Sequence, residues 1–149
     1  MIIADALCKH LDSRLYCIDP WDDAYTVNVE KFKDLDHYFK GQYERFIHNT
    51  RGADKIVPLR GTSDTQLPIL PNESVDFAYI DGDHSPEQVY KDGINIHSKM
   101  KMGGILIFDD YEWEHNGLRC RDGIDRFVEE HKSKYTIIHK AWHLVLLKQ

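Results

Sequence analysis

The sequence contains no glycine before Gly41, which excludes a glycine-rich turn from its first forty residues. It also contains no apolar run of membrane-spanning length and no signal peptide. The formal net charge of −6 argues against a nucleic-acid backbone or an anionic membrane surface as the main partner. Its three cysteines, Cys8, Cys17 and Cys120, are odd in number and lack metal-ligand spacing, which indicates reduced thiols in a cytoplasmic protein.

The length of the chain, 149 residues, corresponds to one domain with enough residues to bury a hydrophobic core. Internal repeats, low-complexity tracts and interdomain linkers are not evident in the sequence. We therefore expect a single domain that spans residues 1–149.

Two short apolar runs in the second half of the chain are typical of buried strands. Residues 75–80 read VDFAYI and residues 104–108 read GILIF. Runs of this kind fit strands that are covered on both faces. The first run is followed by Asp81, and the second is followed by Asp109 and Asp110.

A helix is predicted between these two strands. Ser85 is a favourable N-cap, Pro86 suits the first helical position, and Gln88 stands where a capping box has Glu or Gln. Apolar or small residues then recur at helical spacing, and a glycine pair is expected to end the helix: Val89, Gly93, Ile96 and Met100, then Gly103-Gly104. A strand–helix–strand unit makes the two strands parallel, with a right-handed crossover.

Parallel strands place the acidic residues that follow them at one edge of the sheet, where open α/β folds bind ligands. Asp81, Asp109 and Asp110 should lie within one or two strand spacings, about 5 Å each. Carboxylates this close repel one another and require a proton, water or a cation between them. An all-oxygen cluster suits Mg²⁺, Mn²⁺ or Ca²⁺ better than zinc. The alternative is that these aspartates only cap turns and helices.

The motifs YIDGDHSPEQVYKD (residues 79–92) and KMGGILIFDDYEW (residues 101–113) resemble the second half of the class I S-adenosylmethionine-dependent O-methyltransferases. The similarity is greatest to the branch that includes the macrolide and aminocoumarin sugar O-methyltransferases. It implies that a divalent metal, with Mg²⁺ expected, is held by Asp81, Asp109 and Asp110. It also implies that Asp83 or His84 is the general base. Asp83 is preferred because His84 directly precedes the helix cap, while His84 is the alternative because its unperturbed pKa lies nearer neutrality.

The resemblance further implies an S-adenosylmethionine site after two earlier strands. Asp19 follows a predicted strand at residues 15–18, in the position where the family has an acid for the cofactor ribose. From the local sequence alone, an aspartate in a simple turn is the favoured interpretation of Asp19. Ser63 follows a predicted strand at residues 55–59 and corresponds to the residue that lies against the adenine. The expected cofactor contacts are Asp19, Trp21, Gly61 and Ser63.

The fold implied by the resemblance is the Rossmann-like methyltransferase fold of the α/β class, with a mostly parallel sheet. A hairpin formed by residues 135–139 and 142–147 is expected to add antiparallel strands at the C-terminus. The glycine-rich turn of dinucleotide-type folds precedes the ribose-binding acid by about 20 residues, which is the start of this chain when counted from Asp19. The first strand and its glycine-rich loop are therefore expected to be missing, through N-terminal truncation or in a natural short form. We accordingly expect weak cofactor binding or none, and a homo-oligomer.

Further helices are predicted within residues 1–12, 35–49 and 117–130. Tyr111, Glu112 and Trp113 leave the sheet edge in positions from which they could line a substrate pocket. His139 and His143 are four residues apart, but they flank the hairpin turn without further ligands, so a zinc site is not expected there.

The function expected from these features is metal-dependent transfer of a methyl group from S-adenosylmethionine to a hydroxyl group of a small molecule or sugar. The alternative is a non-catalytic binding or partner subunit of the same fold, which the missing cofactor loop favours. A phosphoacceptor receiver domain also groups aspartates at strand ends. It places its aspartate pair after the first strand and a lysine after a late strand, however, and this chain has a different order.

Overall fold

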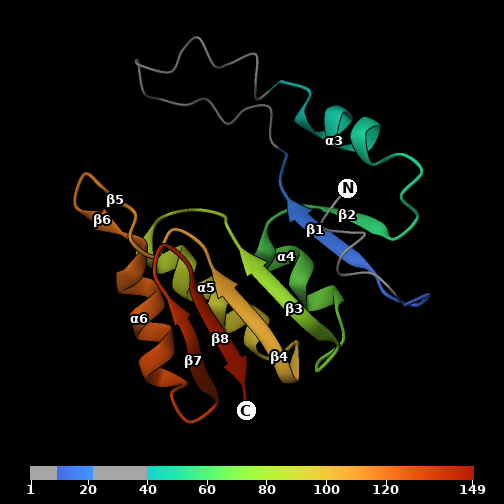
Figure 1. The fold of residues 1–149 in the computed structure, drawn as a ribbon. Helices are drawn as coiled ribbons and strands as arrows, with labels where there is room; N and C mark the ends of the chain where they lie inside the picture. The colour runs from blue at the N-terminus through green and yellow to red at the C-terminus, as the bar shows by residue number, and fades with distance from the viewer. Residues whose placement is uncertain (1–9, 22–39) are drawn as a thin grey trace. The chain divides into compact units, whose positions relative to one another are not determined.

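The structure, a computed structural model, describes residues 10–21 and 40–149 (Figure 1). It divides into two compact units, Met1–Thr62 and Ser63–Gln149, and each has its own main sheet. The predicted helix within residues 1–12 falls almost entirely outside the described residues. The same holds for the first part of the helix predicted at residues 35–49.

The first unit contains a parallel pair of strands and one described helix. Strand β1 (Leu15–Asp19) pairs with β2 (Ile56–Arg60), and the register places Asp19 opposite Arg60. Helix α3 (Gln42–Thr50) lies between them in the sequence. The buried ring of Trp21 packs against Tyr43 and Phe46 of this helix, with ring centroids 5.2 and 4.8 Å apart.

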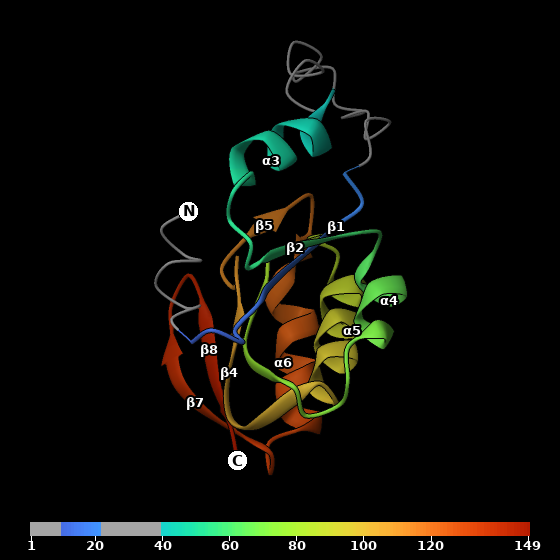
Figure 2. The same ribbon diagram turned by 90° about the vertical axis from the view of Figure 1, so that its right-hand side faces the viewer.

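The second unit is built on a four-stranded sheet in the order β3-β4-β8-β7 (Figures 1 and 2). The strands are β3 (Val75–Ile80), β4 (Met100–Phe108), β7 (Tyr135–Lys140) and β8 (Leu144–Lys148). β3 and β4 are parallel, while β8 is antiparallel to both β4 and β7. The predicted α/β fold is thereby confirmed, with parallel pairs before an antiparallel C-terminal hairpin.

Two helices, α5 (Pro86–His97) and α6 (Cys120–Glu130), cover one face of this sheet (Figures 1 and 2). A short α4 (Ser63–Gln66) and a 3₁₀ helix η2 (Leu67–Ile69) precede β3. A two-residue hairpin of β5 (Glu114–His115) and β6 (Leu118–Arg119) precedes α6 and was not predicted. Within the described ranges, no helix combines the length and the apolar character that crossing a membrane requires.

The core of the second unit lies between the helices and the covered face of the sheet. Alternate residues of the two central strands are fully buried, namely Leu106 and Phe108 of β4 and Leu144 and Leu146 of β8. This alternation is what a sheet with one helix-covered face produces. The helices contribute Phe127 and Ile124, which are also fully buried.

The predicted end of helix α5 was wrong. The helix ends at His97, and β4 already begins at Met100, which is paired with Val75 of β3. The register then shifts, so that Phe77 is paired with Ile105, and Gly103 adopts a φ of +76° within the irregularity. The glycine pair therefore forms a bulge inside a strand, where glycine is common, and does not stop a helix. The apolar Met100 fits the helical spacing and the strand equally well, which explains the error.

Candidate functional site

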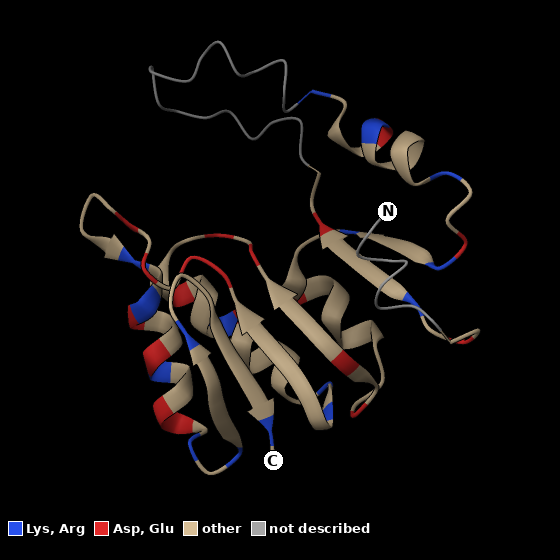
Figure 3. Ribbon diagram, viewed as in Figure 1, with Lys and Arg blue, Asp and Glu red and all other residues tan. Residues whose placement is uncertain are grey.

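The carboxyl ends of β3 and β4 carry acidic residues (Figure 3). The parallel register pairs Ile80 with Phe108, so Asp81 and Asp109 each follow one member of a pair. The backbone N–H of Asp109 also donates to the carbonyl oxygen of Ile80, at 2.9 Å. The structure therefore places Asp81 and Asp109 side by side at one edge of the sheet, as the strand–helix–strand pattern predicted.

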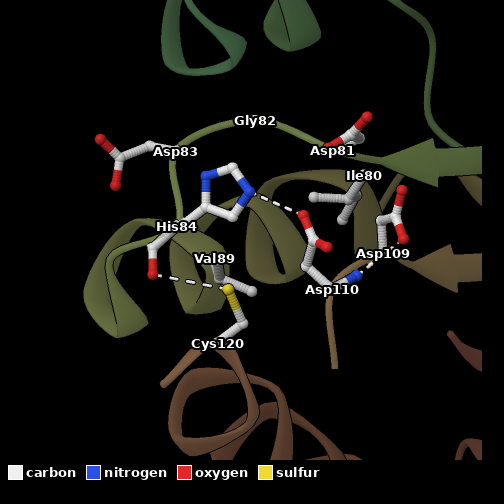
Figure 4. A pocket seen from close by; sticks show the side chains of 9 residues that line it. All are labelled: Ile80, Asp81, Gly82, Asp83, His84, Val89, Asp109, Asp110 and Cys120. Atoms are coloured by element: carbon white, nitrogen blue, oxygen red, sulfur yellow. Dashed lines mark hydrogen bonds and ion pairs between the residues drawn. The ribbon is translucent and has the colours of Figure 1, made fainter. Parts of the chain in front are cut away.

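Asp110 turns out of the strand direction and meets His84 (Figure 4). Its φ of +53° is in the left-handed region, which aspartate adopts more readily than most residues other than glycine. Its Oδ2 lies 2.6 Å from Nε2 of His84, which is within hydrogen-bonding distance. The centroid of the Trp113 ring lies 4.7 Å from that of the His84 ring, and its role in lining a substrate pocket stays a prediction.

The side chains at this edge fit a divalent cation. Asp81, His84 and Asp110 each offer one ligand atom, and these atoms all lie within 4.8 Å of one another. Partial burial, followed by the carboxylates of Asp109 and Asp110, raises the pKa of Asp81. A cation would relieve this repulsion; carboxylate oxygens suit Mg²⁺, Ca²⁺ and Mn²⁺, whereas an imidazole ligand suits Zn²⁺, Fe²⁺ and related ions. His84 thus completes the group of converging donors, and Asp109 lies beside Asp81 but outside this group.

Asp83 points to the start of helix α5 (Figure 4). It is exposed, and its Oδ1 accepts a hydrogen bond from the backbone N–H of Ser85 at 2.7 Å. The hydroxyl of Ser85 accepts from the N–H of Gln88 at 3.4 Å, which confirms the predicted N-cap. Asp83 therefore takes the place that the side chain of Gln88 has in a capping box. The general-base role of Asp83 stays a prediction.

Ser63, the predicted adenine contact, is held by a buried carboxylate within the second unit. Its hydroxyl donates to Oδ1 of Asp92 on α5, and the Nε2 of Gln88 donates to the same oxygen at 2.9 Å. Burial raises the pKa of Asp92. This contact could not be predicted from the sequence, because an aspartate within a helix is usually exposed.

The remaining predicted cofactor residues belong to the first unit. The carboxylate of Asp19 accepts from the N–H of Trp21, and the N–H of Gly61 donates to the carbonyl oxygen of Asp19 at 2.9 Å. Asp19 and Gly61 are therefore neighbours, as the cofactor prediction requires. Trp21 is buried against α3, so its observed role is in packing.

Three residues at the acidic edge were missed by sequence reasoning. Tyr79 donates its hydroxyl to Oδ2 of Asp109 at 2.6 Å, and Nε2 of His143 lies 3.0 Å from Oδ1 of the same carboxylate. The buried thiol of Cys120 lies 3.5 Å from the carbonyl oxygen of His84, and burial raises its pKa to about 11. His143 could have been predicted only from the antiparallel pairing of the hairpin with β4, and the register of that pairing could not be deduced from the sequence.

Comparisons with known proteins agree on the class. A family model described as a methyltransferase domain matches residues 1–111. The structure is similar to the O-methyltransferase NovP, with a TM-score of 0.67 and 18% identity, over 99% of this chain and 64% of that chain. It is also similar to the SAH-bound methyltransferase PaMTH1 from Podospora anserina, with a TM-score of 0.54 and 11% identity, over 91% of this chain and 60% of that chain. A search of curated proteins finds no match.

The chain thus spans less than two thirds of the length of both structures, and identities this low speak for a shared fold alone. The family match is independent of those structures and covers most of the 149 residues. It includes both strands that end in the acidic edge, up to Tyr111. The chain therefore belongs to the methyltransferase-domain family.

Proposed function

We propose that this chain is a metal-dependent O-methyltransferase, or the larger part of one, which uses S-adenosylmethionine to methylate a hydroxyl group of a small molecule or sugar. The observation that carries the proposal is the convergence of Asp81, His84 and Asp110 within 4.8 Å at the carboxyl ends of two parallel strands. Ligands of open α/β folds bind at this edge. Membership of the methyltransferase-domain family supports methyl transfer as the reaction. The neighbouring carboxylates support a bound metal, because they repel one another without a cation.

The metal ligands in this proposal are Asp81, Asp109 and Asp110. The adjacency of Asp81 and Asp109 across the β3–β4 ladder supports this assignment, since neighbouring carboxylates are stabilised by a shared cation. A divalent cation held there would supply Lewis-acid polarisation of the acceptor hydroxyl. Mg²⁺ is the ion that we expect, because the proposed ligands are all oxygen atoms.

The proton of the acceptor hydroxyl passes to Asp83 in this proposal, with His84 as the alternative base. The Ser85 N–H holds Oδ1 of Asp83 at 2.7 Å, which leaves Oδ2 to accept a proton. S-adenosylmethionine, when bound, would supply the methyl group from its sulfonium, so that the acceptor oxygen gains a bond to the methyl carbon while the carbon–sulfur bond breaks and a neutral thioether is left. Positioning of the two reactants contributes much of the rate in such a displacement.

The cofactor residues in the proposal are Asp19, Trp21, Gly61 and Ser63. The hydrogen bond from the Gly61 N–H to the Asp19 carbonyl oxygen supports a joint role, because it brings two strand ends of the first unit together. The carboxylate of Asp19 would accept hydrogen bonds from ribose hydroxyls.

A second candidate is a non-catalytic binding or partner subunit with the same fold. The absence of glycine before Gly41 favours it, because close approach of a backbone to the methionine end of the cofactor depends on glycine. This candidate keeps the cation site and lacks methyl transfer.

Titration with S-adenosylmethionine, followed by nuclear magnetic resonance to millimolar concentrations in the presence of Mg²⁺, separates the two candidates. The proposed function predicts binding that Asp19→Ala abolishes, with an affinity weaker than micromolar. Cation binding without any cofactor binding would contradict methyl transfer by this chain alone and favour the non-catalytic subunit.

A further inference from the structure

The side chains of Tyr79, Asp109 and His143 come from three adjacent strands or their ends and lie on the same face of the sheet. β3 is parallel to β4 with Tyr79 opposite Ile107, which is two residues before Asp109. β8 is antiparallel to β4 with Leu144 opposite Phe108, so His143 lies next to Asp109. Side chains two residues apart in a strand point to the same face. The topology thus brings a hydroxyl and an imidazole to the two sides of one carboxylate.

Neighbouring groups surround most of the carboxylate of Asp109. Oδ1 accepts from the backbone N–H of Asp110 at 2.7 Å and lies 3.0 Å from Nε2 of His143, the distance of an ion pair. Oδ2 accepts from the hydroxyl of Tyr79 at 2.6 Å. An ionised carboxylate has about four lone-pair positions, two on each oxygen. Two are therefore taken by hydrogen bonds, the imidazole of His143 stands against Oδ1, and the more open position is on Oδ2.

This count limits how Asp109 can bind a cation. Bidentate binding requires access to both carboxylate oxygens, and Oδ1 is flanked by the N–H of Asp110 and by the imidazole of His143. Monodentate binding through Oδ2 is the arrangement that keeps all three contacts. Ca²⁺ accepts bidentate carboxylates and six to eight ligands, about 2.3–2.6 Å away, whereas Mg²⁺ requires a compact octahedron at about 2.0–2.1 Å.

We propose that Tyr79 and His143 are positioning residues that clamp the carboxylate of Asp109 so that it binds a divalent cation through Oδ2 alone, which selects Mg²⁺ over Ca²⁺. This inference rests on the proposed function for the identity of the metal ligands. The two residues of this clamp, Tyr79 and His143, have separate effects on Asp109. Tyr79 fixes the orientation of the ligand oxygen, and His143 blocks the second oxygen.

The two residues can be changed without opening the core. Tyr79 is 47% exposed and the His143 side chain is 44% exposed. Tyr79→Phe removes only the hydroxyl, and His143→Ala removes the imidazole. His143→Gln is the conservative variant, because its amide can still donate to Oδ1. Matched controls are Tyr90→Phe on α5, whose hydroxyl bonds to Glu130, and His139→Ala, which changes an exposed histidine of β7.

The experiment measures the dissociation constants of Mg²⁺ and Ca²⁺ by calorimetry on the full chain and on each variant. Loss of an outer contact to a metal ligand typically weakens binding by about 10- to 100-fold, and we expect this loss of Mg²⁺ affinity in Tyr79→Phe. His143→Ala should shift the ratio of the two constants toward Ca²⁺ by about tenfold or more, since Asp109 can then bind through both oxygens. His143→Gln should restore the wild-type ratio.

The outcomes separate the clamp from the metal site. Wild-type Mg²⁺ affinity in Tyr79→Phe, together with an unchanged ratio in His143→Ala, would overturn the clamp while the proposed metal site stands. Failure of the unmodified chain to bind either cation would overturn both. Equal effects of the control variants Tyr90→Phe and His139→Ala would likewise overturn the assignment to Tyr79 and His143.

Discussion

Two adjacent aspartates at the end of β4 are each paired with a histidine from a different part of the chain. Asp109 meets His143 from the β7–β8 turn, and Asp110 meets His84 from the loop after β3. The left-handed backbone of Asp110 is what directs the two carboxylates to different partners. At the scale of single residues, the edge is therefore an ordered set of acids and donors, in which each carboxylate has a defined neighbour.

The roles of Asp83 and His84 differ in this set, and a pair of substitutions distinguishes them. In a chain that catalyses methyl transfer, Asp83→Ala should lower turnover by about 10²- to 10⁴-fold, since this is the usual contribution of a general base. It should change cation affinity little, because Asp83 contacts the Ser85 N–H and is outside the group of converging ligand atoms. His84→Ala should lower turnover less. Turnover and Mn²⁺ affinity are to be measured on both variants. A larger loss of turnover in His84→Ala than in Asp83→Ala would show that His84 is the base.

At the scale of elements, two glycines set the approach of α5 and α6. A Cβ on Gly123 would lie 2.0 Å from the backbone oxygen of Pro86, and a Cβ on Gly93 would lie 2.8 Å from Cδ2 of Phe127. The first neighbour is backbone at the start of α5, beside the His84 loop, while the second is a ring that can rotate. Helix packing thus fixes the position of one wall of the site.

The two glycines should respond differently to alanine. Gly93→Ala should lower the free energy of unfolding by about 1–3 kcal/mol, the usual cost of overpacking a core. Gly123→Ala should be more destabilising, because the backbone of Pro86 has to move away. Urea denaturation of both variants measures this order. Equal stabilities, or a more stable Gly123→Ala protein, would show that the α5–α6 contact is not tight.

The C-terminal end of α5 carries a histidine whose protonation opposes folding. Nδ1 of His97 lies 3.1 Å from the Tyr135 hydroxyl, and its ring centroid is 4.5 Å from that of His131. Burial, then the charges of His131, Lys148 and Lys134, lower the pKa of His97 to about 4. The unfolded chain, with a histidine pKa of about 6.5, binds the proton more readily below that pH. The stability contributed by neutral His97 is thus present above pH 6.5 and is lost as the pH falls toward 4.

The loss of stability at low pH through His97 can be tested. Between about pH 7 and pH 5, the urea midpoint of His97→Gln should fall less than that of the unmodified chain, because the variant lacks the depressed pKa. Measuring both midpoints at each pH isolates the contribution of this histidine from the others. An identical decline in the two proteins would contradict the depressed pKa of His97.

Much of the second unit could be predicted from local patterns, and the exceptions have physical causes. The strand before Asp81, the N-cap at Ser85 and the C-terminal hairpin were correct because buried strands, caps and turns are encoded by neighbouring residues. The end of α5 was wrong because Met100 satisfies two periodicities. Contacts that depend on register across strands, such as His143 with Asp109, could not be predicted, since local sequence does not encode the register.

At the scale of the whole molecule, the deepest burial is confined to one unit. Within residues 10–21 and 40–149, the largest fully buried side chains all belong to Ser63–Gln149: Phe108, Phe127, Met100, Leu106, Ile124, Leu144, Leu146 and Cys120. The proposed metal ligands belong to the same unit. This unit therefore holds both the deepest packing and the proposed ligands, and the expectation of a single domain over residues 1–149 stays a prediction.

Residues 63–149 expressed alone should accordingly unfold in one cooperative transition. Mn²⁺ should raise the melting temperature of this fragment, because a ligand that binds only the folded state stabilises it. Circular dichroism during heating, with and without Mn²⁺, measures both effects. A fragment that is unfolded at room temperature would show that residues 1–62 are needed for its stability.

Divalent-cation binding at the acidic edge of β3 and β4 underlies the proposed function. Electron paramagnetic resonance measures it most directly, because free Mn²⁺ gives a signal that protein binding removes. We expect one bound ion, with affinity lowered by at least about 10- to 100-fold in Asp81→Ala and in Asp110→Ala, and unchanged in Asp76→Ala. Asp76 is a matched control, since it is exposed near the other end of β3 and pairs with Lys101. A full Mn²⁺ signal with the unmodified chain, or equal binding by Asp110→Ala, would contradict the claim.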